Sequence, residues 1–312
     1  MPRAAAPRRA KLTPPSASRP IAAAVATPPT WSLPELETSS GCFETMRVYD
    51  GRIFRLQAHL DRLDGSARYL GVRLDETFDA LGRRLRAAVT KSGIRESIVR
   101  VALLPNVERV ASPSIVVQAV PLPPAECYRT GIRIAIVPTK KFSVGQIDPH
   151  SKFSARLGSI MAVMDAQLRG VDEAIFLDAT GSVTESTASN IGIIKRGAFV
   201  APPCKLGLLA GITWQALIEC SRAIGLQVRE ELLTRHDLYN ADEVFLSSSI
   251  KEIIPVRLVD GRAISDGRPG AQTARLHRAF RELVRRELGV VVRDPITLRG
   301  SGKPTGAERG RR

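Results

Sequence analysis

The chain has 312 residues, 44% of them hydrophobic, which is enough for two ordinary domains, and no apolar run approaches the ~20 residues that span a bilayer. The formal net charge is +15, of which residues 1–38 carry +3 and residues 293–312 carry +4. Because aromatic residues make up only 5% and no basic run alternates with stacking rings, the composition favours solvated surface charge over nucleic-acid binding.

The amino-terminal segment has a composition that cannot form a core. Residues 1–34 contain eight prolines, five basic residues and no acidic residue, so we expect them to be disordered. The same composition partly fits an organelle transit peptide, but the proline density argues against the amphipathic helix of such a peptide. The four cysteines are scattered without a metal-site spacing, which indicates a reducing compartment, and we expect a cytoplasmic protein with no metal site.

The first folded part is expected to combine strands and helices. Residues 43–55 alternate as a β-hairpin around Asp50-Gly51, a type I′ turn signal. The spacing of apolar residues predicts helices over 56–70 and 78–89, ending at glycines, and strands over 98–104 and 114–120. Pro121-Leu-Pro-Pro then gives the best domain boundary of the chain.

The second half repeats this mixture. Residues 131–137 alternate as a strand, and Leu157, Ile160, Met161, Met164 and Leu168 fall on one face of a helix that stops at Gly170. Further strands are expected over 172–177, 183–194, 228–232, 243–247 and 255–259, and helices over 212–224 and 273–288. The sequence therefore predicts an α/β or α+β class, with a tail over 1–38, a small α/β domain over 39–122, a larger domain over 123–290 and a basic tail over 291–312.

Lys152 lies in the few residues between that strand and that helix. A lysine at such a junction can have its stem held by packing while its amine faces a cleft. Partial desolvation lowers the pKa of an amine and makes it nucleophilic, as a Schiff-base lysine requires. The chain has 46 lysines and arginines, so the position of Lys152 alone does not indicate a function, and the interpretation depends on the surrounding segments.

Three other segments suggest a site for a phosphate-bearing cofactor. Glu185 stands on a strand among small hydroxyl residues, and a carboxylate beside a pyridine nitrogen keeps the ring protonated. Gly211 precedes a helix whose first residues, Ile212 and Thr213, would offer unpaired amides to a phosphate. Further phosphate donors are expected in Ser248, Ser249 and the guanidinium of Arg62.

Together these segments resemble the fold-type IV pyridoxal-phosphate enzymes, which include branched-chain aminotransferases, D-amino-acid aminotransferases and aminodeoxychorismate lyases. The resemblance covers roughly residues 41–288. Five segments carry it, in family order and at family-like intervals: residues 41–63, the Lys152 segment, T-E-S-T-A-S-N-I (184–191), L-A-G-I-T (209–213) and S-S-S-I-K-E-I-I-P-V (247–256).

The resemblance implies a two-domain enzyme with a small α/β domain and a larger, mixed, β-barrel-like domain. It implies that Lys152 forms the Schiff base with pyridoxal 5′-phosphate and moves the proton, and that Glu185 pairs with the pyridine nitrogen. The phosphate is expected at Arg62, Gly211, Ile212, Thr213, Ser248 and Ser249, with Leu209 on the ring face. A homodimer acting on an amino acid and a 2-oxo acid is also implied.

Four departures from the family are visible in the sequence. The region before Phe43 lacks the usual Asp-Arg-Gly and Gly-Asp-Gly segments, and Ala155 replaces a frequent asparagine. Leu104-Pro-Asn-Val stands where a T-R-G segment is common, so the carboxylate-binding pair of D-amino-acid enzymes is missing. Phe43 takes the place of their active-site tyrosine.

We therefore expect a class IV aminotransferase of branched-chain or D-amino-acid type. The first alternative is aminodeoxychorismate lyase, which uses the same apparatus to release pyruvate and 4-aminobenzoate. The second is a catalytically silent member of the fold that works as a binding protein.

Overall fold

The computed structural model describes residues 41–294 apart from 107, 143, 144 and 146. The predicted tail over 1–38 and most of the tail over 291–312 lie outside the described residues. Among the helices of the described part, none has the length and apolar character that crossing a bilayer requires.

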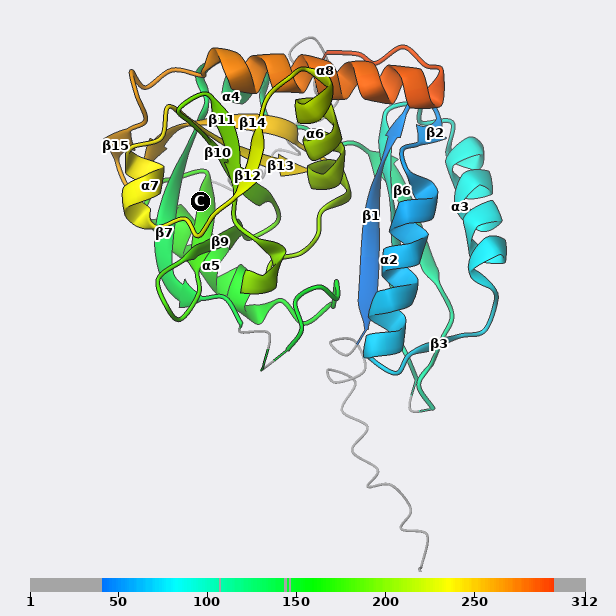
Figure 1. Ribbon diagram of the computed structural model, residues 1–312. Coiled ribbons are helices and arrows are strands. Elements are labelled where there is room, and N and C mark those ends of the chain that lie inside the picture. The colour runs from blue at the N-terminus through cyan, green and yellow to red at the C-terminus, as the bar shows by residue number, and fades with distance from the viewer. Residues whose placement is uncertain (1–40, 107, 143–144, 146, 295–312) are drawn as a thin grey trace, which may run out of the picture.

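The first half forms a four-stranded antiparallel sheet with two helices on one face (Figure 1). Its strands, in spatial order, are β2 (Arg52–Ile53), β1 (Cys42–Tyr49), β4 (Ser97–Leu103) and β6 (Ser114–Ala119). The β1–β2 connection is the predicted type I′ turn, because Asp50 and Gly51 both have positive φ, at 49° and 81°. A separate two-stranded ladder pairs β3 (Arg73–Leu74) with β5 (Val110–Ala111).

The two helices, α2 (Leu56–Tyr69) and α3 (Phe78–Ser92), confirm the helices predicted from apolar spacing. Thr77 caps α3 by accepting a hydrogen bond from the Ala80 amide, and Gly93 ends it with φ 66°. Both helices bury their apolar stripes against the sheet, with Leu60, Leu63, Leu81 and Leu85 among the buried side chains.

The second half forms a nine-stranded mixed sheet that closes on itself, because β9 pairs with both β8 and β10. The order is β12 (Val228–Glu230), β11 (Ala198–Ala201), β10 (Asn190–Lys195), β13 (Glu243–Ser248), β14 (Glu252–Val259), β7 (Ile132–Lys140), β8 (Glu173–Leu177) and β9 (Val183–Ser186), with β15 (Arg262–Ala263) beside β14. A core of isoleucine, leucine and valine side chains fills its interior, which agrees with the barrel-like domain that was expected.

Helices cover the outside of this sheet: α4 (Ala125–Thr130), α5 (Leu157–Leu168), α6 (Ile212–Ala223), α7 (Arg235–Tyr239) and α8 (Ala271–Leu288), with a 3₁₀ turn at Cys204–Leu206. In Figure 1, α8 runs along the top of both halves. Its Phe280 packs edge-on against Phe54, which follows the β1–β2 hairpin, at 5.7 Å between ring centres. Arg55 also bonds Glu219 of α6 and Glu287 of α8, so the hairpin joins the two sheets.

The structure differs from the sequence-based expectation at several elements, among them the strands β3, β5, β11 and β15, which had no prediction. The strand predicted over 183–194 is two strands, β9 and β10, because the chain turns at residues 187–189 and the Ser186 amide donates to the Ser189 carbonyl. The strand predicted over 255–259 begins earlier, at Glu252, and the short helices α4 and α7 had no prediction.

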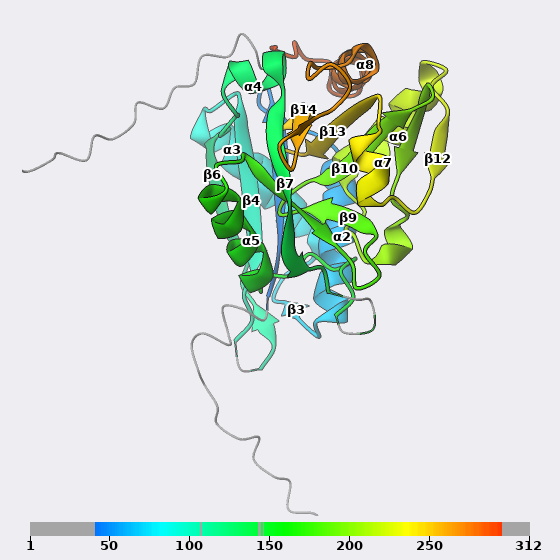
Figure 2. The ribbon, with the colours of Figure 1, turned by 90° about the vertical axis from the view of Figure 1, so that its left-hand side faces the viewer.

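Helix α5 presents its apolar face outward. Figure 2 shows α5 on the outside of the large sheet near β7. Only Ala162 and Ala166 of this helix are buried, against Val137 and Phe176. Leu157, Ile160, Met161, Met164 and Leu168, the face found in the sequence, are each more than half exposed. An amphipathic helix normally buries such a stripe.

Candidate functional site

All nine of the predicted site residues line one cavity of about 390 Å³. They are Arg62, Lys152, Glu185, Leu209, Gly211, Ile212, Thr213, Ser248 and Ser249. The cavity has a size typical of small-molecule sites. Its lining comes from β1 and α2 of the first half and from β9, β10, α6 and the β13–β14 turn of the second half.

The backbone of Lys152 is tied to the first half of the molecule. Its amide donates to Ser66 Oγ on α2 at 3.0 Å, and its carbonyl accepts from the Phe43 amide on β1 at 3.0 Å. The Ser154 amide donates to the Gly41 carbonyl at 2.7 Å, so this segment forms a short β-bridge with the start of β1. The position of the Lys152 side chain is therefore set by elements more than 80 residues away in sequence.

The Lys152 amine lies in an environment that favours its neutral form. Burial is the main cause that lowers its pKa to about 8, and Arg62 and Arg156 lower it further, against the opposing field of Glu44 and Glu185. The amine is 4.9 Å from the centre of the Phe43 ring. A lysine with this pKa has a sizeable neutral, nucleophilic fraction near neutral pH.

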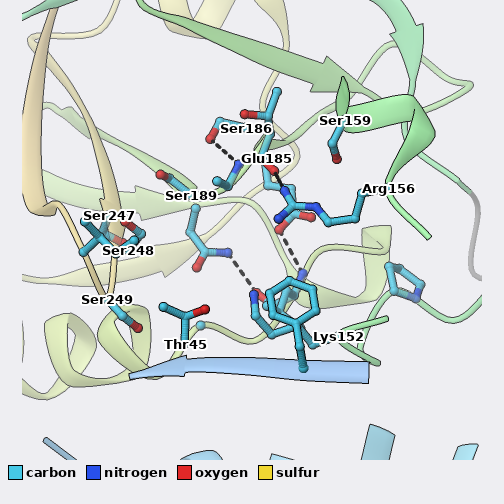
Figure 3. A pocket seen from close by; sticks show the side chains of 18 of the residues that line it. Thr45, Lys152, Arg156, Ser159, Glu185, Ser186, Ser189, Ser247, Ser248 and Ser249 are labelled. Atoms are coloured by element: carbon cyan, nitrogen blue, oxygen red, sulfur yellow. Dashed lines mark hydrogen bonds between the residues drawn. The ribbon is translucent and has the colours of Figure 1, made fainter. Parts of the chain in front are cut away.

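Glu185 is 8% exposed and its carboxylate is held at both oxygens. Oε2 accepts a hydrogen bond from the Leu209 amide at 3.0 Å, and Oε1 forms an ion pair with Lys141. Figure 3 shows Glu185 and Lys152 in the same cavity, with Arg156 beside Glu185. Each carboxylate oxygen has two acceptor sites, so one further donor can still bind from the cavity.

The turn at Leu209–Gly211 is fixed by Asn190 of β10. The Asn190 side-chain amide donates to the Leu209 carbonyl at 2.8 Å. A Cβ at position 211 would lie 2.1 Å from Asn190 Oδ1, so only glycine fits here. Helix α6 starts directly after it, and the amides of Ile212 and Thr213 belong to its first turn, where amides lack intrahelical partners.

Arg62 is held by a buried carboxylate. Glu44 accepts from Arg62 Nε at 2.6 Å and from His59 Nδ1 at 2.8 Å, and Arg62 also donates to the Ala210 carbonyl at 2.7 Å. Burial alone would raise the pKa of Glu44, but Arg62 and His59 outweigh it and lower that pKa to about 2. His59 is thus a structural partner, and Arg62 connects α2 with the Leu209–Gly211 turn.

The serine-rich end of β13 forms the opposite side of the cavity from Arg156 (Figure 3). Ser248 Oγ accepts from the Lys251 amide at 3.2 Å, which keeps the Ser247–Lys251 turn closed. Within the described chain, the hydroxyls of Ser189 and Ser247 have no hydrogen-bond partner although both are buried. Buried hydroxyls without partners are costly, so this side is suited to a polar ligand.

The cavity lining is strongly cationic. Seven basic residues line it and Glu185 is its one acidic residue among those described. Arg100 and Arg156 lie 4.2 and 5.8 Å from the centre of the Phe43 ring, and no ion pair with a carboxylate is found for either in the described part of the chain. Arg156 donates to the Thr187 carbonyl, and burial lowers its pKa from the ordinary value.

Several residues of this site have no counterpart among the predicted ones. Lys141 follows the end of β7, and Arg100 lies in β4 of the other sheet. Asn190 belongs to the 184–191 segment, but no role was predicted for it. The sequence signal for Arg100 is the period of two along β4, which puts it on the same side as Ala102 and not with the buried Val99 and Val101. No cluster of three potential metal ligands occurs among the described residues.

Comparison with known proteins places this chain in a family. The model of the family described as amino-transferase class IV matches residues 41–259. The branched-chain-amino-acid aminotransferase of Escherichia coli K12 is 30% identical over 260 residues, which is 78% of this chain and 84% of that protein.

Two solved structures are similar in fold. The Thermoproteus uzoniensis branched-chain aminotransferase with norvaline has a TM-score of 0.74 and 30% identity, over 80% of this chain and 87% of that chain. The T.th. branched-chain amino acid aminotransferase with pyridoxamine 5′-phosphate has a TM-score of 0.75 and 26% identity, over 80% of this chain and 88% of that chain.

Proposed function

The chain belongs to the class IV aminotransferase family, whose members depend on pyridoxal phosphate, and from this we propose that it exchanges the amino group between an amino acid and a 2-oxo acid with Lys152 as the Schiff-base lysine. The names of the relatives favour transamination over the lyase and over a silent binding protein. The observation that carries the proposal is that Lys152 differs from the other lysines of the cavity in its ion pairing and its pKa.

Lys152 differs from its neighbours in charge pairing. Lys141 is paired with Glu185, and Lys251 is paired with Glu173. An ammonium group held by a carboxylate keeps its proton and is a poor nucleophile. For Lys152 no ion pair is found among the described residues, and burial brings its pKa to about 8. The fourth lysine of the cavity lining, Lys140, is exposed, so Lys152 is the one of the four that is suited to bond the cofactor's aldehyde carbon.

The remaining residues fit pyridoxal 5′-phosphate. The partnerless hydroxyls of Ser189 and Ser247 and the amides in the first turn of α6 are features that a phosphate ligand would use. Arg62, Ile212, Thr213, Ser248 and Ser249 would hold the phosphate. Glu185 would accept a hydrogen bond from the pyridine nitrogen, and Leu209 would contact the ring.

When bound, the cofactor supplies an electron sink for the bond that breaks at the amino acid's α-carbon. Lys152 would act as base and acid there: its neutral amine would take the proton from the amino acid's α-carbon and, once protonated, would return it. The cationic wall of the cavity would hold the anionic substrate.

We place the substrate at the end of the cavity opposite the serines. The relatives' names support a branched-chain amino acid as donor. Arg156 would bind substrate carboxylate, since a desolvated guanidinium needs an anion, and Arg100, which also lies near the Phe43 ring, would add a second guanidinium. Phe43 and Phe142, both of which line the cavity, would contact an apolar side chain.

Reductive trapping tests the role of Lys152. The protein is mixed with pyridoxal 5′-phosphate, reduced with borohydride and digested, and the labelled peptide is identified by mass spectrometry. Label on Lys152 and its loss in Lys152→Ala, together with loss of amino transfer from branched-chain donors to a 2-oxo acid, are expected. Label on Lys141, or full activity of Lys152→Ala, would refute the assignment.

The apolar face of α5 supports a homodimer. Five large apolar side chains of this helix are more than half exposed, which is unusual for a helix of a monomer. The helix starts five residues after Lys152, and its Gly158 and Ser159 line the cavity. We propose that a second copy of the chain covers this face.

A further inference from the structure

Lys141 is the cation nearest to Glu185, and it belongs to no segment that carries the family resemblance. We propose that Lys141 is a positioning residue: its amine fixes the Glu185 carboxylate on the cavity wall and offsets that carboxylate's attraction for the proton of Lys152. This inference rests on the proposed function, because it assigns Lys152 as the reacting amine.

The backbone directs Lys141 toward Glu185. Lys141 follows the last residue of β7, and its amide donates to the Leu177 carbonyl at the end of β8 at 3.0 Å. Its side chain passes Phe176, with Nζ 5.9 Å from the ring centre, and reaches Oε1 of Glu185 on β9. Three neighbouring strands therefore define the contact, and both partners line the cavity.

The contact fixes the carboxylate in orientation. With Lys141 on Oε1 and the Leu209 amide on Oε2, the carboxylate has one donor at each end. A carboxylate held by one donor can rotate away, and a carboxylate that is 8% exposed without a cation is costly. Lys141 thus supplies the second fixed point and the compensating charge.

The contact also changes the field at Lys152. Glu185 is one of the anions that oppose the lowering of the Lys152 pKa. A lysine bound to Glu185 adds a positive charge to the same place, so at Lys152 the pair acts nearly as a neutral group. The other charged or titratable groups that act on Lys152 are Glu44 on β1, His59 and Arg62 on α2, and Arg156 just before α5.

Four variants that alter the charges of Lys141 and Glu185 should change the pH at which Lys152 becomes reactive in different ways. Removing only the cation, in Lys141→Met, leaves Glu185 unopposed and should raise the pH at which Lys152 becomes reactive. Removing only the anion, in Glu185→Gln, should lower it. Removing both charges should bring it back near the starting value, and Lys141→Arg, which keeps the cation, should change it little.

The measurement is the pH dependence of the initial rate of borohydride trapping of pyridoxal 5′-phosphate on the Lys152 peptide. We expect the midpoint for Lys141→Met to rise by roughly 0.5 pH unit or more, given the strength of a single charge in a partly buried site. Lys195→Met is the matched control. The Lys195 amine pairs with Asp237 at 2.7 Å, and neither residue lines the cavity, so the midpoint for Lys152 labelling should not move in this variant.

The outcomes separate the two proposals. If the unaltered protein is not labelled at Lys152, the proposed function fails. If Lys152 is labelled but Lys141→Met has the same midpoint, or a lower one, the inference about Lys141 is overturned and the proposed function stands. Should Lys141→Met not fold, the double variant and Lys141→Arg remain: both must have midpoints near that of the unaltered protein, and a shifted midpoint in either refutes the inference.

Discussion

The Glu44 carboxylate is buried beneath the cavity and accepts hydrogen bonds from two side chains of α2. It does not line the cavity, yet it orients Arg62, which does. The Glu44–Arg62 pair therefore contributes to the stability of the protein and also holds Arg62 in its place in the cavity lining. Glu44 can therefore be tested by pH.

Replacing Glu44 by glutamine should destabilise the protein at pH 7 by about 3 kcal/mol, because it removes the anion from a buried pair. In the folded protein the pKa of Glu44 is about 2, below its ordinary value of 4.5. Its ionisation therefore contributes stability above pH 4.5, and this contribution is lost as the pH falls through 2. Urea unfolding between pH 7 and 3 would measure the difference between the two proteins.

The difference should shrink at the acid end of that series. Glu126 offers a control, because it pairs with Arg129 on the surface and both side chains are more than half exposed. Glu126→Gln should change the free energy of unfolding little at any pH. A Glu44→Gln protein as stable as the unaltered one at pH 7 would contradict this account.

At this scale the sequence predicted the motif residues but not their partners. Lys152, Glu185 and the Gly211 turn were found because junctions, strand positions and helix starts leave local signals. Ser66, Asn190 and Lys141 bind them through contacts whose sequence separations are 86, 19 and 44 residues. Such contacts depend on strand order and register, which one sequence does not show.

Helix α6 is positioned by a close approach between its first turn and β10. Gly211 and Asn190 leave no room for a side chain at position 211. The structure therefore needs glycine at this helix start for space, since its φ of −65° is accessible to any residue.

Gly211→Ala should displace the first turn of α6 and weaken cofactor binding. A shift of about 1 Å in a site can reduce turnover on the order of 10²-fold. Gly65→Ala is the matched control, because Gly65 lies inside α2 with no atom within 4 Å of a Cβ there. The pyridoxal 5′-phosphate dissociation constant, measured by fluorescence, should rise for Gly211→Ala only; equal constants would argue against the tight approach.

Most elements were predictable, and those that were not depend on tertiary contacts. The hairpin and α2, α3, α6 and α8 follow from apolar period and end signals. The division of residues 183–194 into β9 and β10 does not, because both parts are buried and no glycine or proline marks the turn between them. Helix α7 has five residues, too few for a periodic pattern to be distinct.

Helix α5 presents five large apolar side chains that are each more than half exposed, and the proposed dimer gives this face a test. Met164 is 57% exposed, so Met164→Glu should not disturb the fold of one chain but should oppose burial by a second copy. Sedimentation analysis should show a dimer for the unaltered chain and a lower mass for Met164→Glu.

Ala274→Glu adds the same charge at an exposed position of α8 and should leave the dimer intact. A monomeric unaltered chain, or a Met164→Glu protein that stays dimeric, would refute the assignment of this face.

The β-bridge between the Lys152 segment and β1 restricts how a substrate can arrive. Suppose that the two sheets opened like a hinge. If the Lys152 segment stayed on the first half, the Lys152 amine would separate from Glu185 on the second half. If the segment stayed with the second half, the three hydrogen bonds donated by the Phe43, Lys152 and Ser154 amides would break. At ~1 kcal/mol each these bonds make such an opening infrequent. Exchange of one product for the next substrate should therefore proceed through a fixed mouth, where Lys140 and Arg100 would draw anions inward, and at a rate that falls as salt is added.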